Sequence, residues 1–240
     1  MNYRNKFYSK YVSTQTSYLY GEASLEDIKK QFFAWSKYFG EFLPENKNAK
    51  IIELGCGYGG LVFWLQEIGY VNAEGVDIGV EQVETAKKLK IKNINHSNLR
   101  DFIKNKKDLY DVIFIRDVLE HFTKDEILDI LGLVHESLKN NGAVIAQIPN
   151  AGNLFGSHLR YGDFTHEISF TENSANQIFS ISGFKNLKIL PVPRVIYGIK
   201  SLTRSIFWKI IELYLRFYLL VETGFGKRIL TPDLIVIAKK

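Results

Sequence analysis

A short glycine-rich stretch between residues 51 and 60 constrains the fold of this chain more than any other segment. The apolar run Ile51–Leu54 contains one acid, Glu53, and is followed by Gly55, Gly57 and Gly59 at alternate positions. The residues that follow are apolar and predict a helix, so the pattern reads as strand, tight loop and helix. Glycine adopts positive φ and lets a ligand approach the backbone closely. A helix N-terminus offers free N–H groups and a positive dipole end, so the loop is a candidate site for a small ligand with a carboxylate or phosphate.

Strand and helix patterns alternate between residues 50 and 148, which predicts an α/β fold with a parallel sheet and right-handed crossovers. Two further strand patterns lie closer to the C-terminus, so seven strands are predicted in all. The strands are expected at 50–54, 73–76, 91–95, 110–115, 143–148, 184–192 and 234–240. The helices are expected at 24–40, 60–68, 81–89, 123–139, 171–182 and 195–222, with Asn140, Asn141 and Gly142 ending the fourth of them.

The glycine spacing separates two classes of cofactor site. Gly-x-Gly-x-Gly led by Glu53 departs from the dinucleotide fingerprint G-x-G-x-x-G, and it resembles motif I of the class I S-adenosylmethionine (SAM) dependent methyltransferases. The stretches 116–122, 138–143 and 148–150 also resemble the region of strands four and five in small-molecule members of that family. The resemblance implies a Rossmann-like, seven-stranded, mostly parallel sheet with helices on both faces and an antiparallel last strand. It also implies SAM as methyl donor and S-adenosylhomocysteine (SAH) as product.

Asp77 ends the second predicted strand, where nucleotide-binding α/β folds place an acid that accepts hydrogen bonds from ribose hydroxyls. Asn98 stands where the family often has an acid near the adenine, and its amide can accept from the adenine amino group. Glu53 is expected to bond the loop or the methionine amine, and Cys56 to fill space. By resemblance the cofactor-binding residues are Glu53, Gly55, Cys56, Gly57, Gly59, Asp77, Ile78, Asn98, Leu99, Arg116 and Asp117.

Methyl transfer to a hydroxyl needs positioning and a base with a pKa near neutrality. The loop after the fifth strand contains His166, and we predict that it is the general base, oriented by Asp163 or Glu167. A loop histidine that bonds only backbone is the alternative. His121, after the fourth strand, is the second candidate base, or packs near SAM. The histidines and acids would permit a metal, but no His-x-x-x-His spacing supports one, so no metal is predicted.

The Asp-x-Thr-His element at 163–166 looks like bacterial methyltransferases that act on glycans and secondary metabolites. It implies O-methylation of a sugar hydroxyl in a cell-surface glycan or its precursor. Two alternatives stay open: O-methylation of a quinone or other small aromatic, and a non-catalytic partner subunit that binds SAM or SAH. The predicted substrate contacts are Tyr11, Tyr18, Asn150, Arg160, Tyr161 and Glu167.

The segment 195–222 is strongly amphipathic, with an apolar side and a basic side. Packing of its apolar stripe on the domain or in a homodimer is one interpretation, and peripheral membrane contact is the other. The polar N-terminus is unlike a signal peptide, no run reaches a membrane span, and no nucleic-acid motif occurs, so a cytoplasmic protein is expected, with peripheral contact at the inner membrane face as an alternative. The predicted divisions are an arm and lid (1–44), the SAM-binding core (45–194), the amphipathic insertion (195–230) and the last core strand (231–240).

Overall fold

A seven-stranded sheet forms the centre of the computed structural model, which describes residues 3–11, 13–14 and 22–240. The strand order is β3-β2-β1-β4-β5-β7-β6, with β7 antiparallel to both of its neighbours and the pairs from β3 to β5 parallel. This confirms the predicted mostly parallel, Rossmann-like sheet. The strands are β1 (Ile51–Leu54), β2 (Glu74–Asp77), β3 (Ile94–His96), β4 (Tyr110–Arg116), β5 (Leu138–Pro149), β6 (Lys185–Pro191) and β7 (Asp233–Lys239).

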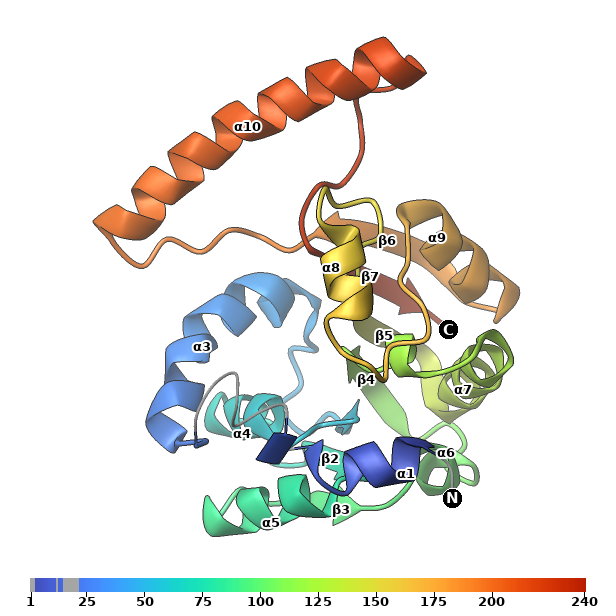
Figure 1. Cartoon of the computed structure of the whole chain (residues 1–240). Helices are drawn as coiled ribbons and strands as arrows, with labels where there is room; N and C mark the ends of the chain where they lie inside the picture. The colour runs from blue at the N-terminus through green and yellow to red at the C-terminus, as the bar shows by residue number, and fades with distance from the viewer. Residues whose placement is uncertain (1–2, 12, 15–21) are drawn as a thin grey trace.

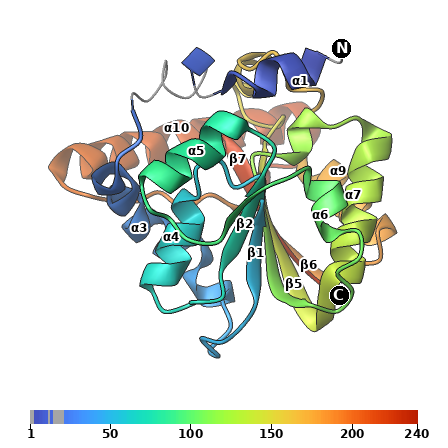
Figure 2. The same ribbon diagram turned by 90° about the horizontal axis from the view of Figure 1, so that it is seen from below.

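Helices cover both faces of the sheet and bury two separate hydrophobic layers. Figure 2 shows α3, α4 and α5 on one side and α6, α7 and α9 on the other. The first layer includes the buried rings of Trp35, Phe39 and Trp64, and the second includes Ile130, Leu131 and Phe179. The α-helices of the described residues are α1 (Tyr3–Tyr8), α3 (Leu25–Phe39), α4 (Gly60–Glu67), α5 (Val80–Lys88), α6 (Leu99–Ile103), α7 (Lys124–Ser137), α8 (Gly156–Tyr161), α9 (Glu172–Ile181) and α10 (Ile199–Thr223).

The central strand β1 is buried along its whole length because helices cover both of its faces. It pairs in parallel with β2 on one side and β4 on the other. The carboxyl ends of the three strands therefore lie side by side, and the loops that follow them gather at one edge of the sheet. Helix α1 lies across this edge (Figure 2). The edge is where open α/β sheets bind their ligands.

The junction between α7 and β5 differs from the prediction. The helix ends earlier, at Ser137, and Asn141 and Gly142 belong to β5 instead of ending the helix. Asn141 has a φ of +65°, and a Cβ on Gly142 would lie 2.9 Å from the carbonyl oxygen of Lys139. The pairing of β5 with the start of β4 is therefore irregular, with a register shift between Tyr110 and Val112. A residue larger than glycine at position 142 would obstruct this pairing. The third strand, at 94–96, is also shorter than expected.

Helix α8 lies in the segment after the fifth strand that was expected to be a loop, α6 lies where no element was predicted, and α1 gives the arm a helix. By contrast, α10 is the amphipathic helix that the pattern predicts. It stands apart from the sheet (Figure 1), and none of its residues is buried. The expectation that its apolar stripe packs on the domain is therefore wrong.

Candidate functional site

The glycine loop after β1 takes a conformation that depends on its three alternate glycines. Gly55, Gly57 and Gly59 have φ values of +71°, +55° and +83°, in the region that L-residues seldom adopt. A Cβ on Gly55 would lie 2.4 Å from Val118 Cγ2, and one on Gly59 would lie 2.7 Å from Ile94 Cδ1. Gly57 differs, because its nearest neighbour would be 3.6 Å away. Gly55 and Gly59 thus permit close packing, whereas Gly57 leaves room beside the backbone for a ligand.

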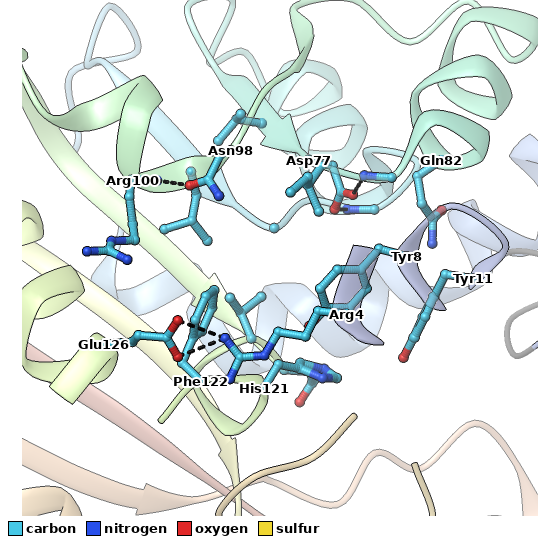
Figure 3. Close-up of a pocket in the computed structure, with 18 residues that line it drawn as sticks. Arg4, Tyr8, Tyr11, Asp77, Gln82, Asn98, Arg100, His121, Phe122 and Glu126 are labelled. Carbon is cyan, nitrogen blue, oxygen red and sulfur yellow. Dashed lines mark hydrogen bonds and ion pairs between the residues drawn. The ribbon is translucent and has the colours of Figure 1, made fainter. Parts of the chain in front are cut away.

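Asp77 ends β2 with its carboxylate held against the loop. Its Oδ2 accepts a hydrogen bond from the backbone N–H of Gly57 at 2.8 Å, and its Oδ1 accepts one from Gly79 at 2.7 Å (Figure 3). Burial raises the pKa of Asp77, and the two backbone bonds act against that rise. Each oxygen keeps a second lone pair, so the carboxylate can accept from a vicinal diol while it stays fixed in place.

A pocket opens beside the glycine loop, between the sheet edge and α1. Its volume is about 280 Å³, near the lower end of the ~300–1,000 Å³ that is typical of small-molecule sites. Side chains of the arm form its outer wall, which makes the pocket tight (Figure 3). The lining residues are Arg4, Tyr8, Tyr11, Gly55, Gly57, Val76, Asp77, Ile78, Gly79, Gln82, Asn98, Leu99, Arg100, Asp117, Val118, His121, Phe122 and Glu126.

One end of this pocket is formed by the start of α6 and the residue after β2. Asn98 caps α6, since its Oδ1 accepts from the backbone N–H of Arg100 at 2.9 Å. Its NH₂ group is not used in the cap and can donate hydrogen bonds (Figure 3). The predicted acceptor role of Asn98 therefore competes with the cap, and the geometry favours Asn98 as a donor. Ile78 and Leu99 also line the pocket and supply apolar surface to it.

Glu53 is 1% exposed and lies behind the loop instead of in the pocket wall. Its Oε1 accepts from Arg116 Nε at 2.8 Å, so the predicted bond to the loop is wrong. Arg116 in turn lies over the ring of Trp35 at 5.4 Å. Burial raises the pKa of Glu53 to about 7, and Arg116 opposes that rise. Within the described residues Glu53 Oε2 has no hydrogen-bond partner, although buried polar atoms usually have one.

Four predicted cofactor residues do not line the pocket, and two of them have structural roles. Cys56 is buried with its Sγ facing Gly75, where a Cβ would lie 2.6 Å away. Burial raises the pKa of the thiol well above its usual value, so Cys56 is an inert space-filling residue. Gly59 begins α4. The four residues are Glu53, Cys56, Gly59 and Arg116.

A chain of hydrogen bonds holds His121 at the other end of the pocket. Tyr11 donates to Asp163 Oδ2 at 2.7 Å, and Thr165 Oγ1 donates to Asp163 Oδ1 at 2.6 Å. The Nδ1 of His121 lies 2.8 Å from Thr165 Oγ1. Burial acts to raise the pKa of Asp163, but the bonds from Thr165 and Tyr11 outweigh it and lower that pKa. Burial lowers the pKa of His121 to about 4, so its ring is neutral at physiological pH.

His166 lies against His121, with ring centroids 4.7 Å apart. Its Nδ1 is 2.9 Å from the carbonyl oxygen of Leu159, which orients the ring. Asp163 and Glu167, which the sequence suggested as orienting groups, bond other partners. The carboxylate of Asp163 reaches His121 through Thr165 instead. The structure thus brings together the two predicted histidines and Asp163, with a different connection among them.

Asn150 was predicted to contact substrate, and this prediction is wrong. Its side chain is 1% exposed and donates to the carbonyl oxygens of Ile229 and Thr231 at 2.9 and 2.8 Å. Its Oδ1 accepts from the backbone of Gly152 at 2.8 Å. Both N–H groups are used, so Asn150 anchors the chain before β7.

The other predicted substrate residues divide between arm and loop. Tyr11 lines the pocket, whereas Tyr18 lies outside the described residues. Arg160 donates to the carbonyl oxygens of His166 and Glu167, which makes it a brace for the histidine loop. Tyr161 is 77% exposed and does not line the pocket. Glu167 accepts from Tyr3 and lies 3.6 Å from Arg4, so it ties the arm to this loop.

Several residues of the site were missed in the sequence. Arg4 and Tyr8 come from the arm, and Arg4 contacts Glu126 at 2.8 Å (Figure 3). Glu126 also completes a capping box with Thr123 at the start of α7. A Thr-x-x-Glu pattern signals that cap, but nothing in the sequence shows that Glu126 faces residues 122 positions earlier. Thr165 was visible only as part of the Asp-x-Thr-His element.

The comparisons with known proteins agree with this geometry. Residues 25–189 match a family model described as a methyltransferase domain. A solved SAM-dependent methyltransferase from Archaeoglobus fulgidus is 20% identical, with a TM-score of 0.64 over 91% of this chain and 95% of that chain. One from Thermotoga maritima is 13% identical, with a TM-score of 0.63 over 98% of this chain and 99% of that chain.

A third similar structure contains the cofactor. Phosphoethanolamine N-methyltransferase 2 of Haemonchus contortus, solved with SAM, is 15% identical, with a TM-score of 0.60 over 97% of this chain and 60% of that chain. These likenesses concern the fold. A search of curated proteins returned no match.

Proposed function

Because the chain belongs to the methyltransferase family whose domain model matches its residues 25–189, and is a SAM-dependent enzyme, we propose that it methylates a hydroxyl of a sugar. The observation that carries the proposal is the histidine pair at the end of the cofactor pocket. His121 lines that pocket, and the ring of His166 lies against the ring of His121. Methylation of a hydroxyl requires a group that takes its proton, and neutral imidazoles are suited to that role.

The pocket residues fit SAM. Asp77 offers two oxygens to the ribose hydroxyls, and Gly57 leaves its backbone open beside them. Ile78 and Leu99 would flank the adenine, with the amide of Asn98 at its edge. When bound, SAM supplies an activated methyl group on a sulfonium, and the buried acids around the pocket favour that positive charge.

The hydrogen bonds around the two histidines support different roles for them. Thr165 uses its proton on Asp163, so its oxygen accepts from Nδ1–H of His121, and Asp163 positions His121 through Thr165. The low pKa of His121 makes it a weak base. His166 donates from Nδ1 to Leu159, which leaves the lone pair of Nε2 to take the proton of the acceptor hydroxyl.

Exposed aromatic rings support a sugar as acceptor. Phe7 and Phe164 stack at 5.3 Å, with Tyr3 edge-on to Phe164, next to Asp163 and Thr165. Such surfaces can pack against sugar rings while polar groups bind the hydroxyls. The rings of Tyr8 and Tyr11 around His121 equally suit a quinone or other small aromatic, which is the second candidate acceptor class.

Turnover with labelled SAM tests this proposal. The parent protein is screened against sugars, lipid-linked glycans and phenols, and His166→Ala is then compared with it on the best acceptor. Loss of a base lowers kcat by ~100-fold or more, with SAM affinity retained. His158→Ala, an exposed histidine on α8, is the control and should keep full turnover. Transfer to phenols alone would select the aromatic acceptor, and SAM binding without transfer to any acceptor would select the non-catalytic partner.

We also propose that α10 rests on an anionic membrane surface. Its polar residues Ser205, Lys209, Glu212 and Arg216 line a cleft shared with the segments around 191–194 and 227–231. Large apolar side chains on its other side are exposed. They include Ile199, Ile206, Ile210, Leu213, Tyr214 and Phe217.

Charge favours a membrane over a second copy of the chain as the occupant of this surface. The segment 194–228 holds seven basic and two acidic residues, so it carries the whole formal net charge of +5. Two copies brought together along α10 would repel each other, whereas anionic lipid would attract this segment. Among the described residues, no helix has the length and apolar character needed to cross a membrane. A lipid-linked glycan would be met at such a surface.

Flotation with vesicles tests the membrane proposal. Vesicles that contain anionic lipid should carry the parent protein, and neutral vesicles should carry much less. A Leu213→Glu, Phe217→Glu variant should remain in the soluble fraction, while Leu128→Glu on α7, another exposed apolar position, should still float. A dimer in solution that Leu213→Glu and Phe217→Glu dissociate, without any flotation of the parent, would instead make α10 a subunit interface.

A further inference from the structure

Glu120, His121 and His166 form a cluster at the acceptor end of the pocket. One ligand atom from each lies within 4.8 Å of the other two. Glu120 and His121 belong to the short 3₁₀ helix Leu119–His121 after β4, and His166 belongs to the loop after α8. No metal-ligand spacing is visible in the sequence, because only two of these residues are adjacent and the third follows 45 positions later.

The hydrogen bonds leave the same nitrogen open on both histidines. Nδ1–H of His121 is used on Thr165 Oγ1, which cannot donate back because its proton is on Asp163. Nδ1–H of His166 is used on the carbonyl oxygen of Leu159. Each ring therefore keeps its lone pair at Nε2. Metal-binding histidines are commonly held in this way, with the second ring N–H bonded to a carbonyl, hydroxyl or carboxylate.

Glu120 supplies an independent observation. Its side chain is 2% exposed, and its Oε2 has no hydrogen-bond partner among the described residues. The carboxylates of Asp117, Asp233 and Asp163 act on it electrostatically. A buried acid with an open oxygen, surrounded by other acids, marks a place where positive charge is missing.

We propose that Glu120, His121 and His166 bind a divalent transition-metal cation such as Zn²⁺. Two imidazole nitrogens and one carboxylate oxygen form a donor set that suits zinc and leaves a position open for a substrate oxygen. Three atoms that all lie within 4.8 Å of one another have a common point no more than ~2.8 Å from each, against ~2.1 Å for a Zn–N bond. The three side chains thus need to close by less than ~1 Å, within the reach of small χ rotations.

The role of the cation rests on the proposed function, whereas its binding does not. The acceptor hydroxyl would occupy the open position, and the cation would lower the pKa of that hydroxyl as it lowers that of bound water. The hydroxyl proton leaves to solvent water, and the oxygen attacks the methyl carbon of SAM. The new C–O bond forms as the C–S bond breaks, and its electron pair stays on sulfur as neutral SAH. With the cation bound, His166 is a ligand instead of the base.

Calorimetric titration of the chelator-stripped full chain with Zn²⁺ tests the site, and Co²⁺ absorption reports the ligand set. The parent should bind one equivalent, with d–d bands of a four- or five-coordinate cobalt centre. Glu120→Gln and His166→Ala should each weaken binding at least tenfold, and His158→Ala should not. Absence of saturable zinc binding by the parent would overturn the proposal. So would an affinity for zinc in Glu120→Gln and His166→Ala that equals that of the parent.

Two controls keep the outcomes separate. Thermal melts show whether Glu120→Gln is folded, and if it is not, the half-buried His166→Ala decides alone. SAM titration in chelator shows whether the cofactor binds without the cation. SAM binding without zinc binding rejects only the cation site. Zinc binding by a protein that binds no SAM rejects the proposed function and leaves the cation site intact.

Discussion

At the scale of single residues, the three glycines after β1 differ in what they do, and so do the substitutions they tolerate. Gly55 combines a φ of +71° with a virtual Cβ 2.4 Å from Val118. Gly55→Ala should lower the free energy of unfolding by ~2 kcal/mol through backbone strain and overpacking. Gly132 in α7 has nothing within 4 Å of a virtual Cβ, so Gly132→Ala should raise stability by ~0.5–1 kcal/mol. Urea unfolding of both variants checks this. Equal changes in the free energy of unfolding would contradict the different roles of the two glycines.

Asp233 predicts a pH dependence of stability. Burial, followed by the charge of Asp117, raises its pKa to about 7, against ~3.9 in the unfolded chain. Between pH 4 and 7 the folded state therefore holds a proton that the unfolded state has released, so this group's contribution to stability falls as pH rises through that window. Asp233→Asn should be more stable than the parent by ~2 kcal/mol at pH 8 and nearly equal to it at pH 4. Urea unfolding at several pH values checks this. A difference in the free energy of unfolding between variant and parent that stays constant with pH would contradict it.

The sequence predicted the residues of the site better than their connections. The glycine spacing and Asp77 identify the donor pocket because their roles depend on local backbone geometry. Glu53 was predicted to bond the loop or the methionine amine, but its hydrogen-bond partner in the structure is Arg116, which lies 63 positions away on β4. Asp163 was assigned to His166, three residues on, yet it serves His121 through Thr165. Such pairings depend on which strand ends meet, and a single sequence does not contain that information.

At the scale of elements, hydrophobic periodicity predicted the sheet and the helices that cover it, but it did not predict the short helices. Helices α6 and α8 have five and six residues, too few for a repeating apolar face. The end of α7 was misplaced because Asn-Asn-Gly is a strong stop signal. In the structure it accommodates the irregular start of β5 instead. The direction of the apolar side of α10 was also unpredictable, since periodicity shows that a stripe exists and not what it faces.

Helix α1 is held over the pocket by specific contacts that a single substitution can remove. Arg4 is 11% exposed and reaches both oxygens of Glu126 at 2.8 Å. Arg4→Ala should loosen the arm by ~1–2 kcal/mol, since a partly buried, doubly bonded ion pair is stronger than an exposed one. Hydrogen exchange of the α1 amides should then accelerate ~10-fold, and SAM should dissociate faster.

The matched control for the arm is Lys30→Ala. It removes an exposed pair with Asp27 at 2.6 Å, where both side chains are more than 60% exposed. Neither exchange in α1 nor SAM release should change. Unaltered exchange in Arg4→Ala would show that other contacts hold the arm.

At the scale of the whole molecule, the chain separates the donor site from the segments that surround it. The sheet, its two hydrophobic layers and the loops at one edge form the part that binds SAM. The arm, the loop 150–170 and α10 are added around that edge. They hold the aromatic rings, the histidine loop and the net positive charge, which are the features that we propose select an acceptor. The donor could therefore be predicted from a local motif, whereas the acceptor depends on segments brought together by the fold.

The most direct test of the central claim is calorimetric titration of SAM into the full chain. We expect one SAM to bind per chain. Asp77→Asn should reduce the affinity ~10-fold or more, because it removes the charge of the acceptor for the ribose diol. Asp101→Asn, an exposed acid on α6, should bind like the parent. Absence of SAM binding by the parent, or unchanged affinity in a folded Asp77→Asn, would contradict the assignment of this pocket to the methyl donor.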